Sequence, residues 1–222
     1  ASTMTDAIVR PNVIITEVYG GGGNTGATFK NDFIELYNTT NSPIDISGWS
    51  IQYYSATGTT PGTDGSNVHT FPSGSIIPAK SHFLIQQAAG TGGTADLFEP
   101  NVSGTLAISG TSGKVILFTT NTAQTITSDI SSVTGHVNFK DYLPFGASTP
   151  VWGSAMSATT NTTSTTRKKV SGEYVYSQNI GNDFEAVTPT PQNSGKYRTK
   201  GSGNLNDNLN WEFTDNGTWI DV

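Results

Sequence analysis

The sequence contains no cysteine, so a disulfide framework and thiolate metal sites are excluded. It is also poor in charge, because Lys, Arg, Asp and Glu make up 13% of the chain against about 25% in typical proteins. Eleven residues are Lys or Arg, 17 are Asp or Glu, and the net charge is −6. Nucleic-acid binders usually carry a basic face, whereas here the basic residues cluster only at residues 167–169. We therefore expect no nucleic-acid partner and no attraction to anionic membrane surfaces.

Long apolar runs are absent as well. No segment approaches the ~20 apolar residues that span a bilayer, so we expect no membrane insertion. The opening residues Ala1, Ser2 and Thr3 have neither a charged start nor an apolar run, and we interpret them as a mature N-terminus left after a signal peptide is removed. A fragment boundary would look the same. Hydrophobic residues are 34% of the chain, alongside 25 glycines and 34 threonines, a composition typical of secreted or cell-surface proteins.

Strand signals dominate, and no segment keeps a helical periodicity over three turns. Residues 32–38 alternate with period two, with Ile34 and Leu36 on one side and Phe33, Glu35 and Tyr37 on the other. Further strands are expected at residues 13–19, 44–46, 49–53, 68–71, 82–86, 106–108 and 114–119, with weaker signals at 126–130 and 136–142. Residues 154–166 predict a long loop, and residues 211–222 a hairpin around Asn216-Gly217. Many short strands separated by turn signals favour an all-β sandwich or barrel.

The strongest pattern is residues 13–38, VIITEVYGGGGNTGATFKNDFIELYN, followed by PIDISGWSIQY at residues 43–53. These segments resemble the opening of bacterial lamin-tail domains and the turn into that family's Gly-Trp strand. Residues 76–79, 83–85, 114–117, 182–184 and 189–194 are similar to later parts of the family. The residues that carry the motif, to which the resemblance gives a structural role, are Glu17, Gly20, Gly21, Gly22, Gly23, Asp32, Glu35, Gly48 and Trp49.

The resemblance implies an immunoglobulin-like β-sandwich with long loops, and it supplies no catalytic residue. Similar bacterial domains sit on secreted and surface proteins, sometimes beside nucleases or phosphatases, as attachment or interaction modules. We expect three parts: an N-terminal arm at residues 1–11, the lamin-tail-like sandwich at 12–194, and an extension with a hairpin at 195–222.

Candidate chemistry is sparse, so we expect no enzyme and no resident cofactor. The run of four glycines lacks the following helix that a phosphate loop requires, and it favours a wide, flexible bend. His69, His82 and His136 lack metal-ligand spacing, and no Gly-x-Ser-x-Gly elbow is present. For the acidic residues we favour a structural role, in which Glu17 and Glu35 cap loops or accept hydrogen bonds from backbone N–H groups. The alternatives are general acid-base work and calcium binding. The acidic candidates are Glu17, Asp32, Glu35 and Asp45.

Interface candidates lie mainly outside the resemblance. The arm contains the apolar stretch Ala7, Ile8 and Val9, which predicts strand addition to a sheet edge of another copy. Aromatic residues in polar surroundings are common contact residues, and here they are Trp152, Trp211, Phe213 and Trp219. Three hypotheses follow. We favour a self-assembling filament, layer or appendage subunit; the alternatives are a monomeric module that attaches to a surface protein or polysaccharide, and an accessory domain of a secreted nuclease or other hydrolase.

Overall fold

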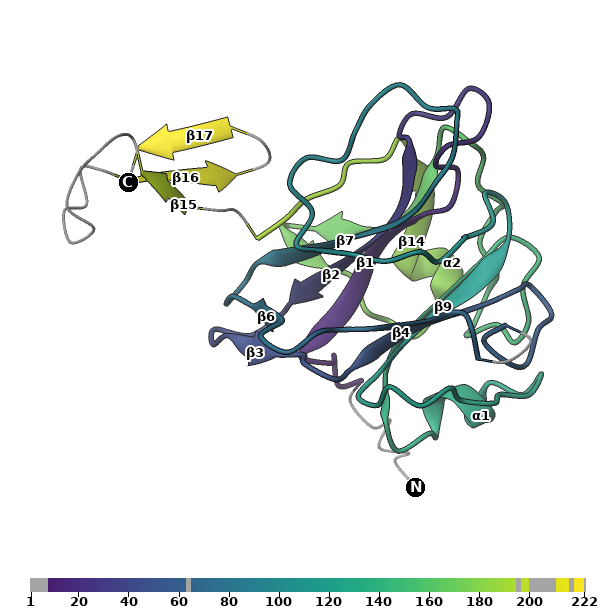
Figure 1. Ribbon diagram of the computed structural model, residues 1–222. Coiled ribbons are helices and arrows are strands. Elements are labelled where there is room, and N and C mark those ends of the chain that lie inside the picture. The colour runs from purple at the N-terminus through teal and green to yellow at the C-terminus, as the bar shows by residue number, and fades with distance from the viewer. Residues whose placement is uncertain (1–7, 63–64, 195–196, 200–210, 216–217, 222) are drawn as a thin grey trace.

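The computed structural model describes residues 8–62, 65–194, 197–199, 211–215 and 218–221, the last three ranges as backbone only. Two layers face each other and form a β-sandwich, as Figure 1 shows, and their strands pair antiparallel except for the parallel pair of β7 and β8. The larger sheet has the order β14 (Phe184–Val187), β11 (Ser164–Arg167), β1 (Val13–Tyr19), β2 (Asn31–Asn38), β7 (His82–Ala89) and β8 (Val102–Ser103). The smaller sheet has the order β10 (Phe139–Phe145), β9 (Gly113–Phe118), β4 (Ser50–Tyr54) and β5 (Val68–Thr70).

Short elements decorate the sandwich. β3 (Ile44–Asp45) pairs with β6 (Ile76–Ile77), and β12 (Lys169–Val170) pairs with β13 (Glu173–Tyr174). Two helices of one turn are α1 (Ser131–Thr134) and α2 (Ile180–Asp183). The chain ends in a separate antiparallel sheet of β15 (Tyr197–Thr199), β16 (Trp211–Asp215) and β17 (Thr218–Asp221). Within it β16 and β17 pair with Asp215 opposite Thr218, which confirms the predicted hairpin.

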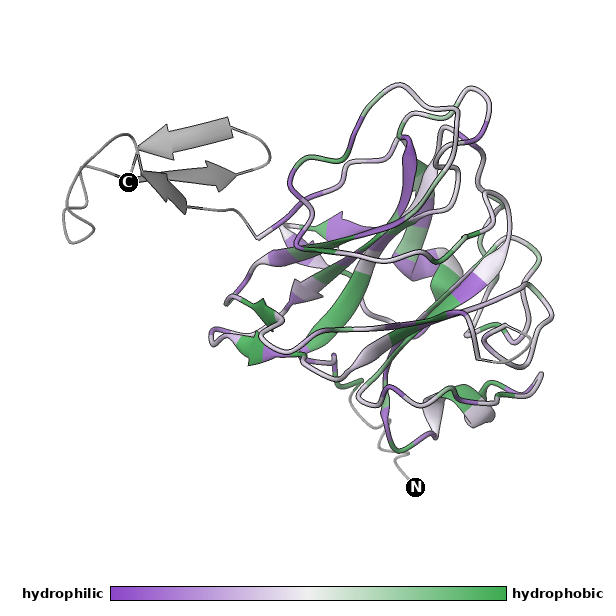
Figure 2. Ribbon diagram, viewed as in Figure 1, coloured by the Kyte–Doolittle hydropathy of each residue, from purple (hydrophilic) through white to green (hydrophobic). Residues whose placement is uncertain are grey.

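The period-two pattern of the sequence explains how the core forms. Ile34 and Leu36 of β2 join Val13, Ile15 and Val18 of β1 in the cluster between the layers. The smaller sheet contributes residues such as Ile51, Val115 and Leu143. Figure 2 shows hydrophobic segments along β1 and β3, whereas the long loops are mostly pale. Phe33 and Tyr19 point the other way, into a second cluster on the outer face of the larger sheet.

Several expected elements differ in the structure. Residues 164–167, placed in a loop, form β11 between β1 and β14; Thr and Ser hide this strand because they give no apolar alternation. Leu106 and Ile108 are buried, but residues 106–108 are not a strand, since the N–H groups of these two residues go to the side chains of Gln87 and Asp32. Residues 126–130 are not a strand either; the chain passes instead into α1, near which Ile126 is buried.

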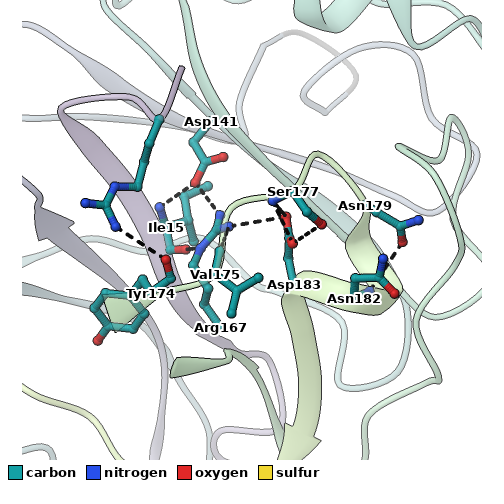
Figure 3. A network of polar contacts seen from close by, with 10 residues as sticks. Ile15, Asp141, Arg167, Tyr174, Val175, Ser177, Asn179, Asn182 and Asp183 are labelled. Carbon is teal, nitrogen blue, oxygen red and sulfur yellow. Dashed lines mark hydrogen bonds and ion pairs between the residues drawn. The ribbon is translucent and has the colours of Figure 1, made fainter. Parts of the chain in front are cut away.

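A buried ion pair joins the two layers beside Ile15 (Figure 3). β11 pairs with β1 only at Glu17 and Val18, so Ile15 has no strand partner on that side. Arg167 Nε donates to the Ile15 carbonyl at 2.8 Å, and the Ile15 N–H donates to Asp141 Oδ2 at 2.7 Å. Arg167 and Asp141 are themselves joined at 2.7 Å, with both side chains buried. This cross-layer ion pair therefore makes the hydrogen bonds to Ile15 that a neighbouring strand would otherwise make.

The guanidinium is held from every side. Arg167 Nη1 donates to the Val175 carbonyl at 3.1 Å and lies 3.8 Å from Asp183 Oδ2. Its planar group stacks 4.2 Å from the Phe184 ring centre, a geometry that favours arginine over lysine. Burial raises the pKa of Asp141, and the positive charge of Arg167 opposes that rise.

Arg167→Ala is expected to destabilise the fold by about 3–5 kcal/mol, because it leaves a buried carboxylate without its cation. Arg10→Ala is the control, since Arg10 forms an exposed ion pair with Glu173 at 3.3 Å and such pairs contribute less than about 1 kcal/mol. Urea unfolding of both variants measures the difference. Equal losses of unfolding free energy would contradict the role of the cross-layer ion pair.

Candidate functional site

Two carboxylates face each other on the outer side of the larger sheet. Glu17 of β1 and Glu35 of β2 are direct cross-strand partners. A β-bulge between Ile15 and Glu17 shifts the side-chain alternation of β1. Glu17 and Glu35 are both buried, although like charges opposite each other destabilise a sheet. We call Glu17 and Glu35 the carboxylate pair.

A crossing segment, residues 188–194, covers the carboxylate pair, and we call it the strap. The Thr190 N–H donates to Glu17 Oε1 at 2.9 Å, and the Gln192 N–H donates to Glu35 Oε2 at 2.6 Å. The Thr16 hydroxyl donates to Glu35 Oε1 at 2.6 Å. The strap is not part of any sheet. Its backbone N–H groups are bound by the carboxylate pair and not by a neighbouring strand.

His82 and Tyr174 close one side of the site. His82 Nε2 lies 2.7 Å from the Tyr174 hydroxyl and 3.7 Å from Glu35 Oε1. Burial lowers the pKa of His82 to about 3, with a smaller effect from Lys169. The imidazole is therefore neutral at physiological pH, and its approach to Glu35 is a dipolar contact and not an ion pair.

The protonation of the carboxylate pair follows from its burial. Burial raises the pKa of Glu35 to about 8, and the negative charge of Glu17 adds to the rise. Burial also raises the pKa of Glu17. Lys169, whose ammonium lies 4.4 Å from the Tyr174 ring centre, lowers the pKa of Glu35 but does not cancel the rise. At neutral pH Glu35 is thus protonated, and the pair avoids carrying two charges.

A cavity of about 340 Å³ opens at the carboxylate pair. Its lining residues come from β1, β2, β11 to β14 and the strap: Thr16, Glu17, Glu35, Thr166, Arg167, Lys169, Tyr174, Glu185, Thr190 and Gln192. A carboxyl group that titrates near neutrality is suited to proton transfer. Here three of the four carboxylate oxygens already accept hydrogen bonds of 2.9 Å or less, so the arrangement is better suited to holding the strap.

The four acidic candidates lie in three places. Asp32 accepts the N–H groups of Gly22 and Ile108 at 2.9 and 2.8 Å, and burial raises its pKa to about 7. Asp45 is exposed and accepts the Ser47 N–H. The predicted acceptance of backbone N–H groups is confirmed for Glu17 and Glu35, and the structure shows the same for Asp32 and Asp45. Of the four, only the carboxylate pair meets, and among the described residues no group of three or more His, Asp or Glu is placed to hold a metal.

The glycine run forms the predicted bend between β1 and β2, but it is a tightly packed corner where a flexible bend was expected. A Cβ on Gly20 would overlap the Ser109 carbonyl, and one on Gly22 would overlap the backbone at Asn31. The N–H of Gly22 also binds Asp32. Glycine is needed here because the backbones of several loops approach one another directly. The motif residues Gly48 and Trp49 form a turn in which Gly48 has φ of +75°, and Trp49 packs against the core.

The interface candidates differ in burial and in whether the structure describes them. Trp152 packs against the core between the layers and against a further cluster that includes Ile116 and Tyr142. It also lies edge-on to Phe139 and Tyr176, so it is a packing residue. Ile8 and Val9 are 49% and 81% exposed. Ala7 and the side chains of Trp211, Phe213 and Trp219 lie outside the described residues.

Sequence reasoning missed Arg167, Asp141, Tyr174 and the strap's function. The run at residues 167–169 suggested only a basic cluster, yet Arg167 is buried, Lys168 donates to the Gly181 carbonyl, and Lys169 lies over Tyr174. The adjacent β-branched residues Thr165 and Thr166 before an arginine give a strand signal, and it is weak.

Comparison with protein families identifies a family for this chain. The family model described as Lamin Tail Domain matches residues 7–136, more than half of the chain. A search of curated proteins found no match. In the part of the chain that the structure describes, no helix is long and apolar enough to cross a membrane.

Glu35→Gln is expected to remove a pH-dependent loss of stability. A carboxyl group whose pKa is raised on folding, here from 4.5 to about 8, stabilises the fold fully below pH 4.5 and loses that contribution as the pH rises through 8. Wild type should therefore lose up to roughly 4 kcal/mol between pH 5 and 9 from this group. Urea unfolding across that range measures it.

Asp32 and Glu17 titrate in both proteins, so the difference between the two pH profiles reports Glu35 together with its effect on the neighbouring Glu17. The variant should match wild type near pH 5 and be more stable near pH 9. Parallel pH profiles for the two proteins would show that Glu35 is ionised at neutral pH and contradict the interpretation.

Proposed function

The chain belongs to the lamin tail domain family, and from this membership we propose that it is a non-catalytic, extracellular structural protein that assembles with copies of itself. The family is immunoglobulin-like and non-enzymatic, which makes the chain a binding or structural module. Secretion and surface localisation are supported by the low charge and the Thr- and Gly-rich composition.

The observation that carries the proposal is the exposed apolar pair Ile8 and Val9. It lies directly before β1, in a segment without regular structure. The following residue, Arg10, is anchored to its own domain through Glu173 and the Tyr174 carbonyl, both at 3.3 Å. The Arg10 anchor fixes where the arm leaves the domain, while the side chains of Ile8 and Val9 remain exposed.

β14 is the sheet edge best suited to receive such an arm. It is the terminal strand of the larger sheet and pairs only with β11. Glu185 and Ala186 in its middle are exposed, whereas the longer edge strand β10 is largely buried. An exposed edge offers unpaired backbone groups to a strand from another chain. An arm from one copy on the β14 edge of the next is a head-to-tail contact, which extends into a filament unless it closes into a ring.

Deleting residues 1–9, or combining Ile8→Asp with Val9→Asp, should abolish assembly, because both changes remove the apolar contact and retain the Arg10 anchor. Analytical ultracentrifugation over a hundredfold concentration range measures the effect. Wild type is expected to form oligomers that grow with concentration, and both variants should remain monomers.

Val170→Asp is the matched control, since Val170 is also an exposed apolar residue and lies outside the arm. It should assemble like wild type. A wild-type monomer at every concentration, or full assembly of the arm variants, would refute self-assembly through the arm. A monomer would favour the alternative of an attachment module, or of an accessory domain in a larger secreted hydrolase.

A further inference from the structure

A second cavity, of about 350 Å³, opens on the other side of the strap. Its lining residues are Phe29, Asp96, Phe98, Thr190, Pro191 and Gln192, and we call it the aromatic pocket. The volume falls within the range of small-molecule sites, about 300–1,000 Å³. Aromatic walls with a few polar groups are the usual lining of such sites.

One of the two rings of the aromatic pocket is held in place by neighbouring rings, and the other is exposed. Phe29 packs edge-on against Tyr19 and Phe33, with ring centres 6.1 and 5.9 Å away. Phe98 is 43% exposed although its neighbour Leu97 is buried. Glu99, the next residue, has a φ of +39°, a strained conformation for a residue other than glycine. Strain of this kind persists only where the surroundings impose it, and it concentrates at ligand sites.

The strap holds the backbone at Phe98 and Glu99. Asn193 Nδ2 donates to the carbonyls of Phe98 and Glu99 at 3.1 and 3.3 Å. Asn101 Nδ2 donates to Ser194 Oγ at 2.7 Å. Because the carboxylate pair fixes the strap at Thr190 and Gln192, the wall of the pocket is built before any ligand arrives.

The polar rim of the pocket carries no net charge. Lys30 Nζ lies 2.9 Å from Asp96 Oδ2 on the surface, so the one carboxylate in the lining is already balanced. An ionic ligand would have to displace this pair. A purely apolar ligand would cover Asp96, Thr190 and Gln192 without offering them partners, and burying unpaired polar groups is unfavourable.

We propose that the aromatic pocket binds a neutral pyranose unit of an oligosaccharide or polysaccharide. The C–H face of the sugar lies against Phe29 and Phe98, whose ring faces carry partial negative charge. Its hydroxyl groups exchange hydrogen bonds with Asp96, Thr190 and Gln192 at the rim. The aromatic pocket shares no residue with the arm, so it stands whether or not the arm pairs copies of the chain.

The test uses the full chain on an array of neutral oligosaccharides built from glucose, mannose, galactose or N-acetylglucosamine. Isothermal titration calorimetry then gives the affinity of any sugar that binds. Phe98→Ala is expected to weaken binding at least about tenfold, and Phe98→Trp to retain it, because Trp restores an aromatic face. Asp96→Asn should weaken binding less than Phe98→Ala.

Val137→Ala is the control, because Val137 is 91% exposed and lies outside the pocket; it should bind like wild type. Unchanged thermal unfolding of Phe98→Ala confirms that the variant folds. The proposal is overturned if no neutral oligosaccharide binds at about 10 mM, or if Phe98→Ala binds as well as wild type. Tighter binding of a proline-rich peptide than of any sugar, lost in Phe98→Ala, also overturns it.

Discussion

The cross-layer ion pair between Arg167 and Asp141 is the constraint on which the rest of the structure depends. A buried ion pair is by itself weak evidence for stability, because desolvation offsets the attraction. Here both partners also satisfy the N–H and carbonyl groups of Ile15, which have no strand partner on that side. The pair therefore ties β1 and β11 of one layer to β10 of the other at a single point. It also fixes the end of the β12–β13 hairpin, since Arg167 donates to the carbonyl of Val175, the residue that follows β13.

From that hairpin, Tyr174 and Lys169 reach the outer face of the larger sheet. Without a cover, this face would expose Glu17 and Glu35 to water. The strap, Tyr174 and His82 cover it, and the protonated state of Glu35 removes the repulsion that two charges would cause. The carboxylate pair thus has a structural role, because its two hydrogen bonds to backbone N–H groups hold the strap in place of strand pairing. Because these hydrogen bonds fix the strap, the strap can also serve as one wall of the aromatic pocket.

The parts of the fold that sequence reasoning predicted are those in which side-chain type reports burial. Ile34 and Leu36 alternate with Phe33 and Glu35, and the structure places them on opposite faces of β2. β11 escaped prediction because Ser164 and Thr165 are buried polar residues whose role depends on neighbours far along the chain. The glycine run misled for a related reason. Glycine permits both flexibility and close packing, and only the loops that meet it decide between them. The partners of Glu17 and Glu35 come from residues 188–194, more than 150 positions away, and no local pattern reveals such a contact.

The segment that matches the family model is not a complete folding unit in this chain. It ends at residue 136, before β10, β11 and β14. Without β10 the smaller sheet loses an edge strand and Asp141, and without β11 the larger sheet loses Arg167 and the partner of Glu17. The N–H and carbonyl of Ile15 would then lie in the core with no partner, a costly arrangement. The carboxylate pair would also lose the strap that accounts for its burial. The matched segment supplies the centres of both sheets. The remaining strands, β10, β11 and β14, complete the two sheets, and the strap that follows β14 forms one wall of the aromatic pocket.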